Sequence, residues 1–260
     1  MSDSRVPLTI ALAAYSHAYE LRSGAVGLAG IRPSFVEEGA ADADVHELPL
    51  ADYVAGRADG DVTVTALPVF LSRGFVHSWI YVGSGHVSAP EPDRTVAIYV
   101  RGLLQERGED ASVVIAPPRC GCAGLRPRFE RAGEVEREYY AQTGVFPIFR
   151  VVVVRTELLD RYRWLASNLY RAFEVARRRY FARLEDIRGS RVPIPSVADH
   201  LMALRQSLGY DVWPYGLEPN RATLEAFVRY ATEQALISGP ADVSDLFARV
   251  EPFVDVTDGV

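Results

Sequence analysis

Leu8 to Ala14 form a continuous apolar run, and this run limits the possible folds more than any other feature of the sequence. It predicts a strand in a parallel sheet that is covered on both faces. Strand-like and helix-like segments alternate along the rest of the chain, which is typical of the α/β class. We expect further strands at 31–37, 62–68, 79–82, 113–116 and 149–155. We expect helices at 48–56, 95–107, 130–143, 157–188, 197–208 and 219–235.

Composition excludes several classes of function. The chain has 260 residues, of which 48% are hydrophobic, so it has ample material for a core. The net charge of -6 argues against nucleic acid as a partner, because phosphate-binding proteins usually present a basic face. All 28 basic residues are arginine. Without lysine, Schiff-base chemistry and a pyridoxal phosphate internal aldimine are excluded.

The two cysteines do not form a recognisable site. Cys120 and Cys122 are separated by one glycine, a spacing that suits neither a disulfide nor a complete zinc site. We interpret them as a reduced pair in a loop and leave their role open. No other spacing of His, Asp or Glu predicts a metal site, and no phosphate-binding glycine motif is present. We therefore expect no metal and no cofactor.

The N-terminus predicts a cytoplasmic protein. Met1 to Arg5 is mixed in charge and the apolar run that follows is short, unlike a secretory signal. No segment reaches the roughly 18 apolar residues of a membrane helix. We therefore expect no membrane association.

Five stretches, in order, resemble the 4,5-dihydroxyphthalate decarboxylase family. They are FLSRGFVHSWIYV (70–82), TVAIYVRGLL (95–104), GVFPIFRVVVVR (144–155), WLASNLYRAFEVA (164–176) and DVWPYGLEPNR (211–221). The resemblance implies a two-lobed α/β fold of the type 2 periplasmic-binding-protein kind, with a ligand cleft between the lobes. It also implies a larger lobe at 1–82 and 148–260 and a smaller lobe at 83–147.

The chain departs from the family in three places. Family members are some tens of residues longer, and the missing residues fall mainly between Ala116 and Glu134, which shortens the second lobe. Arg150 stands where the family often has histidine. Tyr15 lacks the acidic residue usual beside it. The resemblance is therefore a better guide to fold than to substrate.

The Ser-Arg and His-Ser pairs of the first matched stretch are candidate site residues. Arg73, beside Ser72, offers a planar guanidinium that can clamp a carboxylate. His77, beside Ser78, can transfer the proton that a decarboxylation requires. The alternatives are a surface arginine and a structural histidine.

Tyr15 and His17 follow the first strand, where open α/β sheets bind ligands. Tyr15 can stack on a ring or donate to a carboxylate, and His17 is a second candidate for proton transfer. Arg150 is a second candidate carboxylate anchor. An equally good interpretation is that Tyr15 and His17 are ordinary loop residues without a role in binding.

Two further residues complete the candidate set. Thr95 begins a helix whose free N–H groups favour an anion, although helix capping alone explains it. Tyr215 lies in an aromatic cluster that either lines the cleft or packs within one lobe.

Two functions remain open. The first is a cofactor-independent lyase, a decarboxylase for a small aromatic or related carboxylic acid. The second is a non-catalytic solute-binding protein for a small carboxylate, since both classes use this fold. The sequence identifies neither the substrate nor the oligomeric state.

Overall fold

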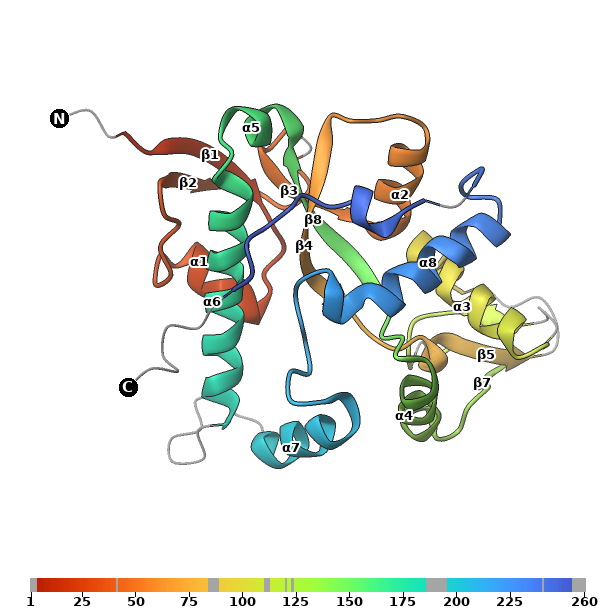
Figure 1. Cartoon of the computed structure of the whole chain (residues 1–260). Coiled ribbons are helices and arrows are strands. Elements are labelled where there is room, and N and C mark those ends of the chain that lie inside the picture. The colour runs from red at the N-terminus through yellow and green to blue at the C-terminus, as the bar shows by residue number, and fades with distance from the viewer. Residues whose placement is uncertain are drawn as a thin grey trace.

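The computed structural model describes residues 4–40, 42–83, 89–109, 113–119, 121–122, 124–185, 196–239 and 241–253. Its strands form a five-stranded sheet of order β2-β1-β3-β8-β4 and a three-stranded sheet of order β6-β5-β7 (Figure 1). The larger sheet consists of β2 (Ile31–Phe35), β1 (Val6–Ala11), β3 (Val45–Pro49), β8 (Ile148–Arg155) and β4 (Val64–Arg73). The smaller sheet consists of β6 (Val114–Ile115), β5 (Ile80–Gly83) and β7 (Leu125–Pro127).

The apolar N-terminal run forms the parallel part of the larger sheet, as expected. β1 pairs in parallel with β2 on one side and with β3 on the other. β8 is antiparallel to both of its neighbours, β3 and β4. Val151 to Val154 have 0% exposed surface, because β8 lies inside the sheet with both faces covered.

Helices cover the sheets. Their bounds are Tyr19–Arg22 (α1), Leu50–Ala58 (α2), Arg94–Glu106 (α3), Ala132–Thr143 (α4), Thr156–Arg161 (α5), Leu165–Glu185 (α6), Val197–Leu208 (α7) and Arg221–Glu233 (α8). Figure 1 shows α6 beside β1 and α1, whereas α3, α4 and α8 lie toward the smaller sheet. In the described part of the chain, no helix is both long and apolar enough to cross a bilayer.

α6 is amphipathic. Leu165, Leu169, Phe173 and Ala176 recur at spacings of three and four residues, so they share one face, and all four are buried. That face packs against β4 and the 3-10 turn Ser16–Ala18. The helix therefore fixes the position of the segment that follows β1.

The chain crosses between the sheets twice, through neighbouring strands. β4 runs to Arg73 and leads into β5, and the chain returns into β8 at Ile148. The Gly74 N–H donates to the Pro147 carbonyl at 3.0 Å, which joins the two crossings. Figure 1 shows β4 and β8 side by side where they leave the larger sheet.

The pairing of β4 with β8 is irregular near this crossing. Leu67 opposes Val152, and the next pair joins Ser72 to Arg150, so β4 contains extra residues between these pairs. Such a bulge bends a strand and redirects its side chains. Two carbonyls in the bulge accept hydrogen bonds from another segment: Pro68 accepts from the Gly216 N–H at 2.8 Å, and Phe70 accepts from Trp213 Nε1 at 3.0 Å.

Some sequence predictions need correction. β4 continues beyond its expected end at Pro68, so Arg73 belongs to a strand and not to a connector. β3 and β7 were not predicted. The helix predicted at 157–188 is divided into α5 and α6, because Tyr162 leaves the helical conformation with φ -124° and ψ 83°.

Two further predictions stay untested. The smaller sheet draws on residues 80–127, whereas the lobe boundaries at 83 and 147 remain a prediction. Cys120 and positions 84–88, near the start of the expected smaller lobe, lie outside the described residues.

Candidate functional site

Strand pairing brings four polar side chains together at one end of the larger sheet. Ser72 and Arg150 are directly opposed in the β4–β8 pair, so their side chains lie on the same face. Arg150 also opposes Pro49 of β3, and Glu47, two residues before Pro49, is its diagonal neighbour on that face. Tyr15 reaches Glu47 from the end of β1. We call Tyr15, Glu47, Ser72 and Arg150 the strand-end cluster.

Hydrogen bonds hold the Glu47 carboxylate in this cluster. Oε1 accepts from the Ala13 N–H at 2.7 Å, and Oε2 accepts from the Tyr15 hydroxyl at 2.8 Å. Burial raises the pKa of Glu47 despite these bonds and the nearby Arg150. Burial, together with the Glu47 charge, also raises the pKa of Tyr15, whose oxygen has a hydrogen bond with the Ser72 side chain. Tyr15 therefore stays protonated at neutral pH.

Arg150 differs from the other three residues of the cluster because its guanidinium is uncommitted, by which we mean that no described residue accepts a hydrogen bond from it. Among the described residues, its guanidinium has neither a hydrogen bond nor an ion pair. Its charge lies close enough to Tyr15 and Glu47 to oppose the burial that raises the pKa of both. A half-buried guanidinium without a protein acceptor keeps its planar donors available for a carboxylate ligand.

A cavity of about 610 Å³ adjoins the cluster at the end of β1. Tyr15, Tyr19 and Tyr180 line it, together with Glu20 and Arg183, which form an ion pair. Its volume falls in the usual range for small-ligand sites of about 300–1,000 Å³. Tyr15 is the member of the strand-end cluster that lines this cavity. The tyrosine walls suit a planar ring, and the Arg150 charge near Tyr15 suits a carboxylate.

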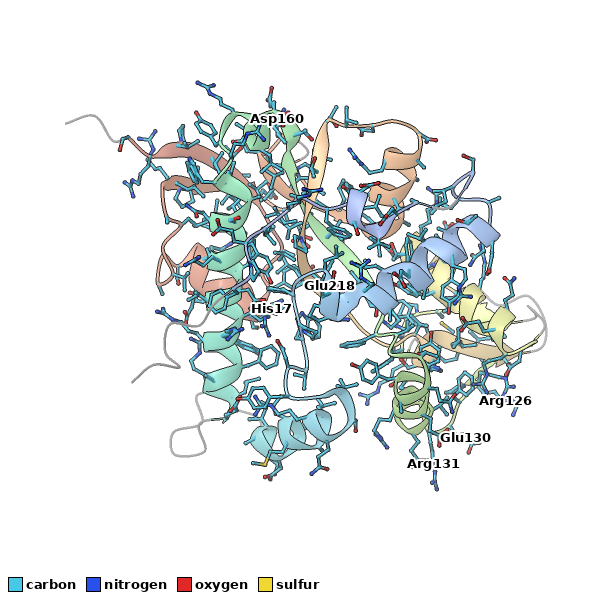
Figure 2. All side chains as sticks on the ribbon, in the orientation of Figure 1. His17, Arg126, Glu130, Arg131, Asp160 and Glu218 are labelled. Carbon is cyan, nitrogen blue, oxygen red and sulfur yellow. The ribbon has the colours of Figure 1, made fainter. Side chains whose placement is uncertain are left out.

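His17 packs against Tyr15 and two other aromatic rings. Its ring centroid is 5.5 Å from that of Tyr15, 5.5 Å from that of Trp213 and 6.3 Å from that of Tyr180. Burial, assisted by the charge of Arg177, lowers the pKa of His17 to about 4. Figure 2 shows His17 on the inner side of α6, unlike Arg126 and Arg131, which project outward. The ring is therefore neutral at pH 7.

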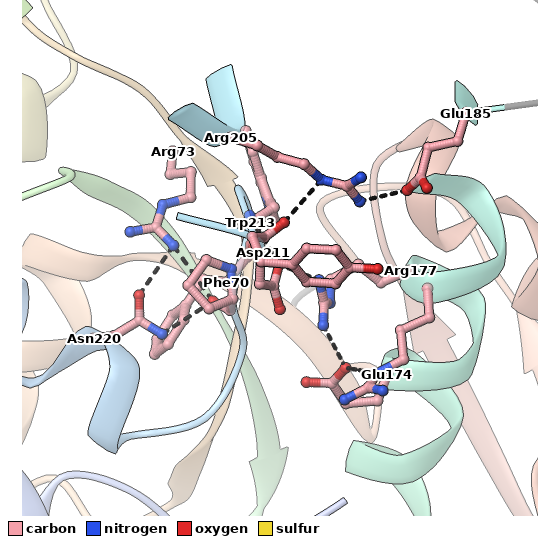
Figure 3. A network of polar contacts seen from close by, with 12 residues as sticks. Phe70, Arg73, Glu174, Arg177, Glu185, Arg205, Asp211, Trp213 and Asn220 are labelled. Carbon is pink, nitrogen blue, oxygen red and sulfur yellow. Dashed lines mark hydrogen bonds and ion pairs between the residues drawn. The ribbon is translucent and has the colours of Figure 1, made fainter. Parts of the chain in front are cut away.

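Arg73 is buried, and its donors are occupied by other parts of the protein. Nη1 donates to Asn220 Oδ1 at 2.9 Å (Figure 3) and to the Pro214 carbonyl. Nη2 donates to the Phe146 carbonyl at 2.8 Å. The guanidinium also lies 4.2 Å from the centre of the Phe146 ring. Burial lowers the pKa of Arg73 to about 10, so it remains charged. This geometry favours a structural role.

His77 lies in a separate cluster. It is 1% exposed, and its ring centroid is 5.5 Å from that of Phe129 and 5.2 Å from that of Tyr139. Neither ring nitrogen has a hydrogen-bond partner in the described part of the structure. Burial, with a smaller effect from Arg107, lowers its pKa to about 4. Arg73 and His77, candidates from the same matched stretch, are thus each packed among different neighbours.

Three remaining candidates also lie outside the strand-end cluster. The Ser78 backbone hydrogen-bonds to Glu136 of α4. Thr95 is 0% exposed, and its Oγ1 accepts from the Ala51 N–H, which joins α3 to α2. Tyr215 is buried and lines a different hollow of about 1010 Å³ between α6 and the segments 208–219 and 244–253.

The anion site expected at Thr95 needs correction. The N-cap of α3 is Asp93, whose Oδ1 accepts from the Thr95 N–H at 2.8 Å. A carboxylate of the protein itself therefore occupies the helix end that was expected to attract an anionic ligand.

Sequence reasoning missed Glu47. It lies in a segment without a strong strand pattern, next to His46, and resembles an ordinary surface carboxylate. Its partner Tyr15 is 32 residues earlier in the chain, so only the β1–β3 pairing reveals the contact. In the described residues, no group of three His, Cys, Asp or Glu side chains is arranged to hold a metal ion.

Two curated proteins have sequences similar to this chain. No family model matches the sequence. A 4,5-dihydroxyphthalate decarboxylase of Comamonas testosteroni is 26% identical over 327 aligned positions, which cover 96% of this chain and 99% of that protein. The chain is related to the 4,5-dihydroxyphthalate decarboxylases. A protein of the same name from Pseudomonas putida is 28% identical over 157 positions, covering 52% of this chain and 58% of that protein.

This chain is shorter than the Comamonas decarboxylase, and its fold is similar to that of solved binding proteins. The Comamonas alignment is longer than the 260 residues of this chain, so that decarboxylase has residues that this chain lacks. A putative periplasmic sulfonate-binding protein, SsuA, from Methylobacillus flagellatus KT is 14% identical with a TM-score of 0.52, covering 96% of this chain and 92% of that one. A Bordetella bronchiseptica RB50 protein is 13% identical with a TM-score of 0.50, covering 94% and 93%. The predicted periplasmic-binding-protein-like α/β fold is confirmed.

Proposed function

We propose that this relative of the 4,5-dihydroxyphthalate decarboxylases is a cofactor-independent decarboxylase that acts on a small aromatic carboxylic acid. The observation that carries the proposal is the uncommitted Arg150 guanidinium, which lies beside Tyr15, Glu47 and Ser72 next to a tyrosine-lined cavity. The decarboxylase relatives supply the reaction class.

The cluster offers separate contacts for the two parts of such a ligand. Arg150 binds a carboxylate through two parallel N–H donors. Tyr15 and Tyr180 provide ring faces for the aromatic part. The position is the usual one for ligands in open α/β sheets, at the carboxyl end of a parallel strand.

The reaction requires balanced transfers of electrons and a proton. The bond between the ring carbon and the departing carboxylate breaks, and its electron pair stays on the ring carbon as carbon dioxide leaves. A proton then joins that carbon, and the electron pair becomes the new C–H bond. Arg150 fits a carboxylate that is retained, since a carboxylate that leaves must lose its charge.

Binding and turnover distinguish this proposal from its alternative, a non-catalytic solute-binding protein with the same fold. The probes are 4,5-dihydroxyphthalate and phthalate, with calorimetry to measure binding and carbon dioxide release to measure turnover. Binding with turnover supports the decarboxylase. Binding without turnover contradicts it and favours the solute-binding protein.

Arg150→Met tests the carboxylate anchor. We expect the Kd for phthalate to rise by about 100-fold, because removing one partner of a buried charge pair costs about 2–5 kcal/mol. The matched control is Arg131→Met, since Arg131 projects from the outer surface near α4 (Figure 2). Unchanged binding in Arg150→Met would place the ligand elsewhere.

A further inference from the structure

The decarboxylation needs a proton donor, and the imidazoles are poorly placed to act as one. His17 packs against Tyr15 with its Nε2 buried, and no other described residue is hydrogen-bonded to that atom. His77 is 1% exposed between Phe129 and Tyr139. A general acid must reach the atom that it protonates, either directly or through one hydrogen-bonded group.

Tyr15 and Glu47 satisfy this requirement. Tyr15 is the residue that the strand-end cluster shares with the lining of the 610 Å³ cavity, and its hydroxyl is the acidic group of its side chain. It is bonded to Glu47 Oε2 at 2.8 Å, while the Ala13 N–H holds Oε1 at 2.7 Å. The second bond leaves Oε2 as the oxygen that exchanges a proton with Tyr15.

We propose that Tyr15 donates the proton to the substrate carbon and that Glu47 supplies the proton to Tyr15. This inference rests on the proposed function. The Tyr15 O–H bond breaks as the new C–H bond forms, and its electrons stay on the tyrosine oxygen. That oxygen takes the proton from Glu47 Oε2, and the carboxylate produced regains a proton from water in the next cycle.

The surroundings of Glu47 are consistent with both protonation states. Tyr15, Arg150 and Glu38 are the titratable groups that act on it, from the end of β1, from β8 and from the segment after β2. Burial and the Glu38 charge favour the neutral carboxyl, whereas Arg150 and the two hydrogen bonds favour the carboxylate. A group balanced in this way can release and regain a proton within one cycle.

The decisive variant is Glu47→Gln, which keeps an acceptor for the Ala13 N–H but has no acidic proton. We expect kcat for 4,5-dihydroxyphthalate to fall by about 100-fold or more, because general acid catalysis contributes about 10²–10⁴-fold. The Kd for phthalate should change less than about threefold, and Glu47→Asp should recover part of the rate. The control is Glu157→Gln, an exposed residue of α5.

A pH profile separates proton supply from a structural role. The parent protein should lose kcat as the pH rises through the Glu47 pKa, because the acid form is required, whereas Glu47→Gln should lack this limb. Tyr15→Phe should be about as slow as Glu47→Gln, and the double variant should be no slower.

The outcomes separate the two proposals. If the parent protein binds the acids but releases no carbon dioxide, the proposed function and this inference both fail. If the parent is active and Glu47→Gln keeps its rate or its pH limb, only the inference is overturned.

Discussion

Arg73 and Arg150 lie on paired strands but differ in their surroundings. Arg73 donates to two backbone carbonyls and to Asn220, so the dipoles of these acceptors stabilise its charge. Arg150 is half-buried without such acceptors among the described residues. Burial of a charge is tolerated only with partners, so the buried Arg73 belongs to the framework, whereas the half-buried Arg150 keeps its donors available.

Replacing each arginine by methionine should separate these roles. Arg73→Met leaves Asn220 Oδ1 and the Phe146 carbonyl without a donor, so we expect the free energy of unfolding to fall by about 2–4 kcal/mol. Arg150→Met should change it by about 0.5 kcal/mol or less. Urea unfolding measures both, and equal losses of stability would contradict the assignment.

At the scale of elements, α3 and α8 approach closely at a glycine. A Cβ added to Gly102 would lie 2.3 Å from Cγ of Tyr230, whose side chain is fully buried. Tyr99, also buried, packs its ring against Phe227 of α8 with 5.1 Å between centroids. The absence of a side chain at Gly102 therefore sets the distance between these helices.

Gly102→Ala should destabilise the protein although alanine favours helices. The clash with Tyr230 costs about 1–3 kcal/mol or more, which exceeds the helix-propensity gain of about 1 kcal/mol. The control is Gly133→Ala in α4, where the added Cβ would meet only Arg137 Nη1 at 3.8 Å, so stability should stay the same or rise. Thermal unfolding measures both, and a stabilised Gly102→Ala would show that the helices can move apart.

The elements most visible in the sequence are those with a strong local pattern. α7 was predicted with its observed bounds, and β1 was predicted as a parallel strand from its apolar residues. β3 was missed because Val45–Pro49 is short, and its stability comes from pairing with β1 and β8, which are distant in sequence.

The site residues, too, were predictable where the local sequence gave a pattern and were missed where they depend on distant contacts. Tyr15 was identified because it follows a recognisable strand, and Ser72 and Arg150 because they lie in stretches that resemble the family, although their binding roles remain predictions. Glu47 could not be identified before the β1–β3 pairing was known. The burial of Arg73 and His77 depends on acceptors and rings that are distant in the chain, for which the local sequence gives no signal.

At the scale of the whole molecule, two buried neutral imidazoles couple stability to pH. The pKa of His17 and that of His77 are both lowered to about 4 by burial, whereas an unfolded chain binds a proton near pH 6.5. Between these values the unfolded state binds more protons than the folded state. Stability should therefore fall as the pH drops from about 6.5 to 4.

His77→Leu tests this coupling. The substitution keeps an apolar side chain of similar size between Phe129 and Tyr139, so part of the acid sensitivity should disappear. The complete contribution of His77 below pH 4 is about 3 kcal/mol, from about 1.4 kcal/mol per pKa unit. Urea unfolding at pH 7.5 and 4.5 measures the difference, with the exposed His200→Leu as control. An unchanged pH dependence in His77→Leu would contradict the burial argument.

The bulge between Leu67 and Ser72 constrains the number of residues in this stretch. Side chains alternate between the two faces of a strand, so one residue more or fewer would turn Ser72 away from Arg150. The Pro68 and Phe70 carbonyls accept hydrogen bonds from Gly216 and Trp213, so the backbone positions of these two bulge residues are fixed. Insertions and deletions in this stretch are therefore incompatible with the assembled cluster. Single substitutions that keep the backbone path are compatible with it.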